Sequence, residues 1–285
     1  MKNIAVFINP AFTDKQAIFS RLEALAAEHG VRFYGISAQR ELLPKGFSLL
    51  DPAGQTAKKP DCILVFGGDG TILRAKDLAL SSGAPLLGIN LGWLGFLSET
   101  TLAELDNSIR DLIKGKYRLL PRMLVQCQLW RGGEIIFKGL ALNDAVIHKA
   151  DTPRLIRVRI FSGGRFVFDT RCDGVVASTP TGSTAYSLAA GGPILAPELR
   201  AIVLSPLNPH LLTIRPMVFS ASDRILMRVH GLEEPAALQL DGENCSPLQD
   251  NDEVLITAAK QQVQFVKLSN RTFYQILRRK MHLGK

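Results

Sequence analysis

The chain has 285 residues, of which 46% are hydrophobic and 21% charged, and this composition excludes a largely disordered protein. Its length suits one large domain or two ordinary ones with a substantial core. The 34 basic residues outnumber the 26 acidic residues, and the formal net charge of +8 favours anionic partners such as nucleotides, nucleic acid or a membrane surface.

Strands and helices alternate in the first third of the sequence. Continuous apolar runs predict buried strands at residues 3–10, 31–36, 61–66 and 85–90. Helical segments are expected at residues 13–30, 71–83 and 102–115, with Thr13 as the N-cap of the first helix and Gly30 just past its end. This alternation predicts a parallel sheet covered by helices on both faces.

The pattern changes near Tyr117, where shorter strands begin. Two hairpins are expected at residues 122–139 and 154–171, each turning at a pair of glycines. Further strands are expected at residues 201–206, 217–220, 224–230, 236–240, 253–257 and 263–268, followed by a closing helix at residues 272–280. We therefore expect an α/β domain at residues 1–118, completed by residues 262–285, and a β-rich domain at residues 119–261.

The cysteines and the hydrophobic runs narrow the class of protein. Cys62, Cys127, Cys172 and Cys245 lie far apart with no C-x-x-C pair, so neither a zinc site nor a disulfide framework is indicated. The N-terminal apolar run of about five residues is too short for a signal sequence, and no stretch approaches the ~18 apolar residues of a membrane span. We expect a cytoplasmic protein. Because no long basic tract is present, we expect neither nucleic acid nor a membrane as its partner.

The first candidate site is the stretch "VFGGDGTIL" at residues 65–73, where three glycines surround Asp69. A strand that ends in glycines and enters a helix directs backbone N–H groups at an anion, and glycines let phosphate oxygens approach closely. The stretch lacks the lysine of a Walker A loop. Asp69 either caps the helix or has a chemical role, because a carboxylate beside phosphate-binding amides repels the ligand unless it serves a hydroxyl or a metal.

Two further candidates lie in the β-rich region. The loop "DGVVASTPTGSTAYSLAAGGPI" at residues 173–194 crowds hydroxyls before a short helix, which predicts either a polar cradle for sugar, base or phosphate or an ordinary surface loop. Asn143 and Asp144 form the other candidate. An amide can read a base edge and a carboxylate can hold ribose hydroxyls, but such a pair is also common in a turn at a strand end.

These segments, in this order, resemble the NAD kinase family. The resemblance rests on "GGDGT" at residues 67–71, "ND" at 143–144, the long string at 173–194, "PHLLTIRP" at 209–216 and "LDGE" at 240–243. It implies an α/β N-terminal domain like those of phosphofructokinases and diacylglycerol kinases, and a β-rich C-terminal domain. It also implies transfer of the γ-phosphate of ATP to the 2′-hydroxyl of the adenosine ribose of NAD, with Asp69 as the general base.

The resemblance further implies a set of contacts. The residues assigned to NAD are Asp69, Gly70, Arg74, Asn143, Asp144, Arg154, Arg171, Asp173, Thr184, Ala185, Tyr186, Ser187, Leu188, Ala189, Asn208 and Glu243. Gly67, Gly68, Gly70 and Thr71 are assigned to the ATP phosphates. Asp144 stands where the family has Glu, and Glu243 stands where it often has Gln. Arg154 and Arg171 equally suit ordinary surface positions, and Tyr186 equally suits a core ring.

The resemblance carries expectations about cofactors and assembly as well. Mg²⁺ is expected to arrive with ATP, because the sequence holds no dense carboxylate cluster and no metal site is predicted. A homodimer or homotetramer is expected, and the use of polyphosphate in place of ATP is left open.

Two other functions use related features. A lipid or sphingoid kinase shares the "GGDGT" turn, and a non-catalytic dinucleotide-binding regulator would share the fold. Among the remaining conspicuous residues, Trp93 and Phe96 are expected to pack in a core, and His148 and His210 are expected to be structural.

Overall fold

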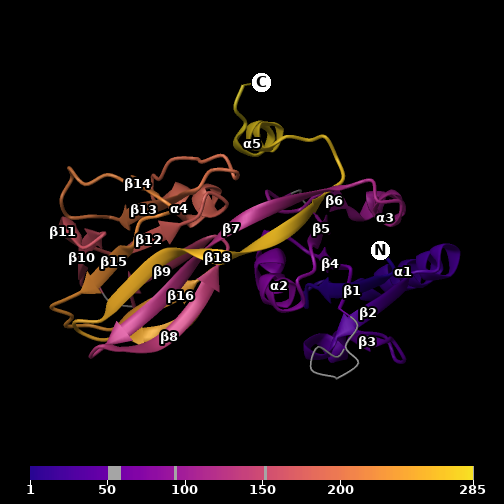
Figure 1. Cartoon of the computed structure of the whole chain (residues 1–285), viewed down its shortest axis with the longest axis horizontal. Helices are drawn as coiled ribbons and strands as arrows, with labels where there is room; N and C mark the ends of the chain where they lie inside the picture. The colour runs from indigo at the N-terminus through magenta and orange to yellow at the C-terminus, as the bar shows by residue number, and fades with distance from the viewer. Residues whose placement is uncertain (51–58, 93–94, 151–152, 285) are drawn as a thin grey trace. The chain divides into compact units, whose positions relative to one another are not determined.

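The computed structural model describes residues 1–50, 59–92, 95–150 and 153–284 (Figure 1). The chain divides into two compact units. Unit 1 comprises Met1–Pro121 and Val263–Lys285, and unit 2 comprises Arg122–Gln262. Trp93 lies outside the described residues, so its expected core position stays a prediction.

Unit 1 contains a parallel sheet with the strand order β5-β4-β1-β2-β3. Its strands are β1 (Asn3–Ile8), β2 (Arg32–Ile36), β3 (Leu49–Leu50), β4 (Cys62–Phe66) and β5 (Leu86–Asn90). The short β6 (Thr100–Thr101) pairs with β5, and the end of β18 (Glu253–Lys267) joins β5 in parallel. All residues of β4 and β5 are buried, which is why these strands are continuous apolar runs in the sequence.

Helices cover both faces of this sheet. Phe19 of α1 (Lys15–His29) and Ile109 of α3 (Leu105–Ile113) share one apolar cluster with Leu64 of β4. Ile72 of α2 (Asp69–Ser82) instead lies against Gly88, whose place in the strand faces the opposite side from its neighbours Leu87 and Ile89. The predicted parallel sheet with helices on both faces is therefore confirmed.

The ends of the helices show how local sequence acts. Gly30 closes α1 in the left-handed conformation with φ 63°, as predicted. The prediction of Thr13 as N-cap is wrong, because Asp14 holds that position and makes no capping bond with its side chain. Near the C-terminus, α5 (Phe273–Met281) begins with a reciprocal capping box between Thr272 and Gln275. A 3₁₀ turn, η1 (Ser37–Leu42), follows β2, and η2 (Leu102–Glu104) precedes α3.

Unit 2 is built from two antiparallel sheets. The first has the order β11-β10-β15-β18-β7-β8, with β7 (Arg118–Arg131), β8 (Glu134–Ala141), β10 (Ile156–Ser162), β11 (Arg165–Cys172) and β15 (Ile225–Val229). The second has the order β14-β13-β12-β9-β16-β17, with β9 (Asp144–Lys149), β12 (Gly174–Ser178), β13 (Ala201–Leu207), β14 (Met217–Ser220), β16 (Ala236–Leu240) and β17 (Glu243–Leu248). The short η3 (Gly182–Thr184) and α4 (Tyr186–Ala189) follow β12.

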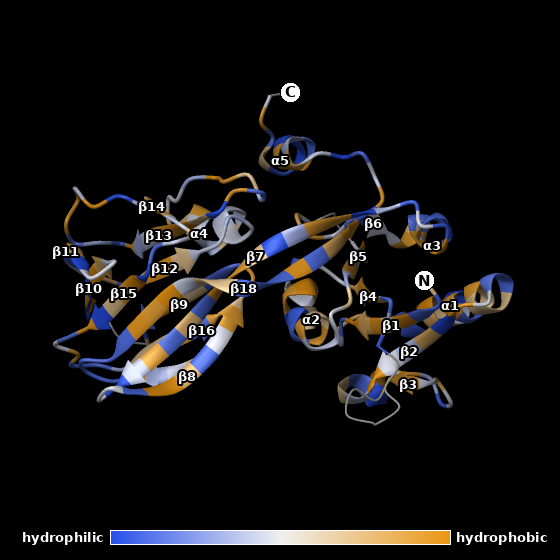
Figure 2. Ribbon diagram, in the orientation of Figure 1, coloured by the Kyte–Doolittle hydropathy of each residue, from blue (hydrophilic) through white to orange (hydrophobic). Residues whose placement is uncertain are grey.

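The two sheets of unit 2 share one core. Ile160 and Met227 from the first sheet and Ile147 and Leu204 from the second belong to the same buried cluster. Hydrophilic residues interrupt the hydrophobic ones in β7, which alternate over residues 125–129, whereas β4 of unit 1 is hydrophobic throughout (Figure 2). An α/β N-terminal part and a β-rich C-terminal part are therefore confirmed.

Two sequence expectations in unit 2 are corrected. Residues 253–257 and 263–268 were expected as separate strands, but β18 is one strand of 15 residues that runs from unit 2 into unit 1. The strand β17 was not predicted, because it contains Pro247 and few apolar residues. As the last strand of its sheet, β17 tolerates a proline, since one of its edges needs no ladder hydrogen bonds. Among the described residues, no helix is long and apolar enough to cross a bilayer.

Candidate functional site

The turn between β4 and α2 places Asp69 at the start of a helix. Gly67 packs against Thr71, and a Cβ atom at Gly67 would lie 2.3 Å from the Thr71 Oγ1 atom, so only glycine fits. The N-cap of α2 is Gly68 and no side chain caps the helix, so the alternative of Asp69 as a helix cap is wrong. Asp69 is instead the first residue of α2, where the helix dipole stabilises a negative charge.

The carboxylate of Asp69 bonds to a loop that is distant in sequence. Its Oδ2 atom accepts a hydrogen bond of 2.8 Å from the backbone N–H of Phe96, and its Oδ1 atom accepts one of 3.1 Å from that of Leu97. A carboxylate has about four acceptor positions, so each oxygen keeps capacity for one more donor. This loop could not be predicted from the sequence, because no residue near Asp69 in the chain indicates which backbone its carboxylate meets.

Two of the glycines assigned to phosphate in unit 1 border open space. A Cβ atom at Gly68 or at Gly70 would meet no other atom within 4 Å. Arg74 lies further along α2 and is exposed, whereas Thr71 is buried. Gly68 and Gly70 therefore leave room beside the first turn of α2, where the helix dipole favours an anion.

In unit 2 the structure joins the segment 142–144 to the loop 178–184. Thr179 donates from its Oγ1 atom to the Leu142 carbonyl at 2.6 Å and from its N–H to the Asn143 carbonyl at 2.8 Å. The Ser178 hydroxyl also donates to the Asn143 carbonyl, at 3.1 Å. A Cβ atom at Gly182 would lie 2.2 Å from the same carbonyl oxygen, so this glycine permits the contact. These hydroxyls therefore bind backbone within the protein, and for Ser178 and Thr179 the expected open cradle of hydroxyls is not found.

Asp144 is a buried carboxyl beside a second carboxyl. Asp144 is only 5% exposed. Asp241 accepts backbone hydrogen bonds from Leu142 at 3.0 Å and from Asn143 at 2.7 Å, and so lies next to this segment. Burial, and then the negative charge of Asp241, raises the pKa of the Asp144 carboxyl to about 7.

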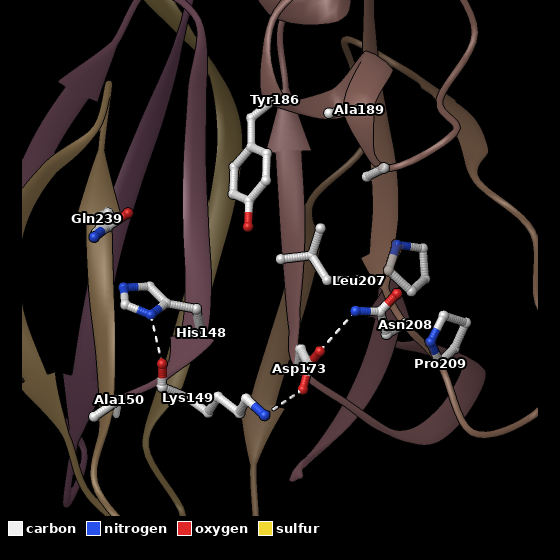
Figure 3. A pocket seen from close by; sticks show the side chains of 12 residues that line it. His148, Lys149, Ala150, Asp173, Tyr186, Ala189, Leu207, Asn208, Pro209 and Gln239 are labelled. Carbon is white, nitrogen blue, oxygen red and sulfur yellow. Dashed lines mark hydrogen bonds and ion pairs between the residues drawn. The ribbon is translucent and has the colours of Figure 1, made fainter. Parts of the chain in front are cut away.

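A pocket of about 670 Å³ opens on the second sheet of unit 2 (Figure 3). Of the residues assigned to NAD, it brings together Asp173, Tyr186, Ala189 and Asn208. The other lining residues were not assigned: His148, Lys149, Ala150, Ala190, Pro206, Leu207, Pro209 and Gln239. His148 and Lys149 come from β9, Leu207 from β13 and Gln239 from β16. Only strand pairing could reveal them, because β9 and β13 lie on either side of β12 and β16 pairs with β9.

Asp173 lies at the centre of the polar side of this pocket. It accepts a hydrogen bond of 2.7 Å from the Asn208 Nδ2 atom and forms an ion pair of 2.7 Å with the Lys149 Nζ atom (Figure 3). The hydrogen bond from Asn208, followed by that from Lys149, holds the pKa of the Asp173 carboxyl below its usual range. Asp173 is therefore an anion at neutral pH.

The rings of Tyr186 and His148 line this pocket, and neither has the purely structural surroundings that the sequence allowed for. Tyr186 is 46% exposed, so it is not a core ring. His148 was expected to be a structural histidine with its hydrogen bonds satisfied. Its Nδ1 atom lies 2.6 Å from the Lys149 carbonyl oxygen, but its buried Nε2 atom has no partner among the described residues.

The remaining assigned residues of unit 2 have varied surroundings. Arg154 is exposed and forms ion pairs with Glu233 and Glu234. Arg171 and Glu243 are exposed on β11 and β17. The Ser187 side chain is fully buried and its hydroxyl bonds to that of Ser205 at 3.0 Å, while Thr184, Ala185 and Leu188 are half-buried. No group of three or more His, Cys, Asp or Glu residues suited to a metal is found in the part of the chain that the structure describes.

Comparison with known proteins decides the family. Two family models match, the ATP-NAD kinase N-terminal domain at residues 39–117 and the ATP-NAD kinase C-terminal domain at residues 142–268. The NAD kinase of Koribacter versatilis is 35% identical over 285 residues, which is 100% of this chain and 99% of that protein. The chain belongs to the NAD kinase family.

Two solved structures share the fold. The yeast NADH kinase, solved in complex with NADH, matches with a TM-score of 0.85 and 26% identity over 99% of this chain and 87% of its own. An NAD kinase from Archaeoglobus fulgidus, solved in complex with ATP, matches with a TM-score of 0.73 and 23% identity over the whole of both chains. As an NAD kinase the chain is an enzyme, so the alternatives of a lipid kinase and of a non-catalytic regulator are wrong.

Proposed function

We propose that this NAD kinase transfers the γ-phosphate of ATP to the 2′-hydroxyl of the adenosine ribose of NAD, with Asp69 as the general base. The 2′-oxygen bonds to the γ-phosphorus as the bond from that phosphorus to the β,γ-bridging oxygen breaks, and ADP leaves. The hydroxyl proton passes to the Asp69 carboxylate. The products are NADP and ADP.

The environment of Asp69 is the observation that carries this proposal. Both carboxylate oxygens are oriented by backbone N–H groups, and each keeps acceptor capacity. A Cβ atom at Gly68 or at Gly70, the residues before and after Asp69 in the chain, would meet no other atom within 4 Å. A carboxylate held in this way is suited to accept a proton from an alcohol, a contribution of about 10²–10⁴ in rate.

The rest of the rate acceleration comes from positioning of the substrates and from neutralisation of the phosphate charges. Phosphoryl transfer needs little covalent help from protein, so neutralisation of the phosphates matters most. Magnesium enters as part of the substrate, bound to the phosphates of ATP. Gly67, Gly68, Gly70 and Thr71 are assigned to the ATP phosphates, and Arg74 is assigned to the phosphates of NAD. The similarity of the sheet to those of phosphofructokinases remains a prediction.

The pocket of unit 2 is assigned to the dinucleotide. It combines an anionic centre at Asp173, a half-exposed ring at Tyr186 and amide groups at Asn208 and Gln239, which suits a ligand with sugars, bases and amides. Asn143 and Asp144 are assigned to the adenosine half, and Thr184 to Ala189 to its surroundings. The neighbour solved with NADH supports a dinucleotide as the ligand of this fold.

The decisive measurement is NADP formation by the purified chain with NAD, ATP and Mg²⁺. We expect NADP only when ATP and NAD are both present. NMR of the product should place the new phosphate on the 2′-oxygen of the adenosine ribose. A phosphate found on another oxygen, or no NADP at all, would contradict the proposal.

A further inference from the structure

The carboxylate of Asp69 lies against a stretch of backbone that only a glycine permits. A Cβ atom at Gly95 would lie 1.9 Å from the Asp69 Oδ1 atom and 2.5 Å from its Cγ atom. These separations are far inside van der Waals contact, so any side chain at residue 95 must displace the carboxylate. The backbone of Gly95, Phe96 and Leu97, called here the 95–97 clamp, therefore sets where the Asp69 oxygens lie.

The 95–97 clamp is itself held by the two residues that follow it. The hydroxyl of Ser98, a residue only 3% exposed, accepts a hydrogen bond of 2.8 Å from the N–H of Gly95. Asn90 donates to the same hydroxyl at 3.3 Å, which ties the clamp to the end of β5. The backbone N–H of Glu99 donates to the Gly88 carbonyl at 2.9 Å and fixes the far end of the segment to that strand.

Glu99 also fastens this segment to the last part of the chain. Its carboxylate, on a residue that is 8% exposed, accepts backbone hydrogen bonds from Leu268 at 3.0 Å and from Ser269 at 2.6 Å. The Lys267 ammonium group lies 2.6 Å from the same carboxylate. A buried carboxylate with three donors is strongly held, because charge-assisted hydrogen bonds in a low dielectric are strong.

A second contact joins the same two segments. The ring of Phe96 lies 6.3 Å, between centroids, from the ring of Phe273 at the start of α5. Residue 96 thus donates its backbone N–H to Asp69 and packs its side chain on the C-terminal helix. Both ends of this connection lie in unit 1.

We infer that Gly95, Ser98 and Glu99 are positioning residues for phosphoryl transfer, acting through the Asp69 carboxylate. The inference rests on the proposed function, in which Asp69 takes the proton of the ribose hydroxyl. Glycine at 95 admits the carboxylate, Ser98 shapes the 95–97 clamp, and Glu99 anchors the clamp to residues 267–269. The remaining acceptor positions of Asp69 are thereby directed at the substrate hydroxyl.

The first test compares two alanine variants in the same loop. Gly95→Ala should lower kcat by about 10- to 100-fold with little change in the KM for NAD or ATP, because a small misplacement of the base slows only the transfer. Gly92→Ala is the matched control, since a Cβ atom there would meet only the Asn90 Oδ1 atom, at 3.9 Å. Equal kcat values for the two variants would overturn the inference.

The second test asks whether the effect passes through Asp69. In an Asp69→Asn background, adding Gly95→Ala should cause no further loss of the residual turnover, because the two changes disable the same group. A full, independent loss in the double variant would show a general structural effect and overturn the inference.

A third variant keeps the inference testable if Gly95→Ala fails to fold. Glu99→Gln retains an acceptor oxygen but loses the charge opposite Lys267, and we expect a fall in kcat without a matching change in KM. This fall should also vanish in the Asp69→Asn background. If the wild type forms NADP and Glu99→Gln has the wild-type kcat, only the inference is overturned. If the wild type forms no NADP, the proposed function is overturned.

Discussion

At the scale of single residues, the environment of Asp69 is the central feature of unit 1. A first-turn position on α2 stabilises its negative charge, and two backbone N–H groups orient it. Both interactions hold the carboxylate in place while it makes no capping hydrogen bond to its own helix. The residue therefore combines a defined position with free acceptor capacity.

The role of Asp69 as general base predicts the effect of an isosteric change. Asp69→Asn removes the proton acceptor but keeps the size of the side chain, so kcat should fall by about 10²–10⁴ while the fold is retained. Steady-state NADP formation and circular dichroism measure the two properties. Asp77→Asn on the same helix is the control, because the Asp77 side chain is 76% exposed. Near-wild-type turnover of Asp69→Asn would contradict the assignment.

The pKa of Asp144 predicts a dependence of stability on pH. In the folded chain the carboxyl keeps its proton up to about pH 7, whereas the unperturbed value is 3.8. Because the folded state binds this proton more tightly, the contribution of Asp144 to stability is full below about pH 4 and is lost as the pH rises to about 7.

Asp144→Asn removes this titration. The free energy of unfolding of the variant, relative to wild type, should rise by about 2–4 kcal/mol between pH 4 and pH 8. Urea unfolding at a series of pH values measures it, with Asp77→Asn as the exposed control. A difference that does not change with pH would mean that the Asp144 carboxyl ionises normally.

At the scale of elements, the turn between β16 and β17 links the fold to the candidate site. Asp241 and Gly242 form a two-residue turn with φ values of 50° and 83°, the conformation that hairpins of this length prefer. The turn directs the Asp241 carboxylate to the backbone of residues 142–144. A hairpin on one side of the sheet thus orders the segment that carries Asn143 and Asp144.

This arrangement predicts a cost for a side chain at residue 242. Gly242→Ala forces alanine into a left-handed conformation and should lower the free energy of unfolding by about 1–2 kcal/mol. It should also raise the KM for NAD, because the 142–144 segment loses its support. Chemical unfolding measures the loss of stability and steady-state kinetics measure the KM for NAD. Gly92→Ala is the control, because a Cβ atom there would meet only the Asn90 Oδ1 atom, at 3.9 Å. An unchanged KM for NAD would show that the turn does not support NAD binding by residues 142–144.

At the scale of the whole molecule, exposed apolar side chains on β14 of unit 2 and in the segment before it support self-association. Leu211, Leu212, Met217 and Val218 are all exposed, and Leu212 is 82% exposed. The last two belong to β14, the strand at one edge of its sheet. An exposed apolar edge strand favours pairing with another chain. We propose that the homodimer or homotetramer expected for this NAD kinase uses this edge.

Substitution of Leu212 tests the proposed edge. Leu212→Asp should shift the sedimentation velocity of the chain toward that of a monomer, because a charge there opposes burial. Ile136→Asp on β8 is the control, since Ile136 is 44% exposed and lies in the other sheet of unit 2. A wild-type chain that is active and monomeric when dilute would contradict self-association altogether.

Features that depend on interactions within a few residues were predicted from the sequence, whereas features that depend on strand pairing were not. The longer strands and the helices of unit 1 were predicted because apolar periodicity and a C-terminal glycine such as Gly30 act within a few residues, whereas the two-residue strands β3 and β6 were not. β17 was missed because its stability comes from pairing with β16, and its own residues are a poor strand sequence. His148, Lys149 and Gln239 were missed as pocket residues for the same reason, since only strand pairing brings them beside Asp173.

By itself, the sequence determined the alternation of elements, the change to a β-rich second part, the glycine turn around Asp69 and, through its motifs, the family. Each of these depends on residues that are neighbours in the chain. Only the tertiary structure decided that Phe96 and Leu97 orient the Asp69 carboxylate and that Asp241 supports residues 142–144. Those contacts join residues 27 to 99 positions apart, and their geometry exists only after the strands have paired and the side chains have packed.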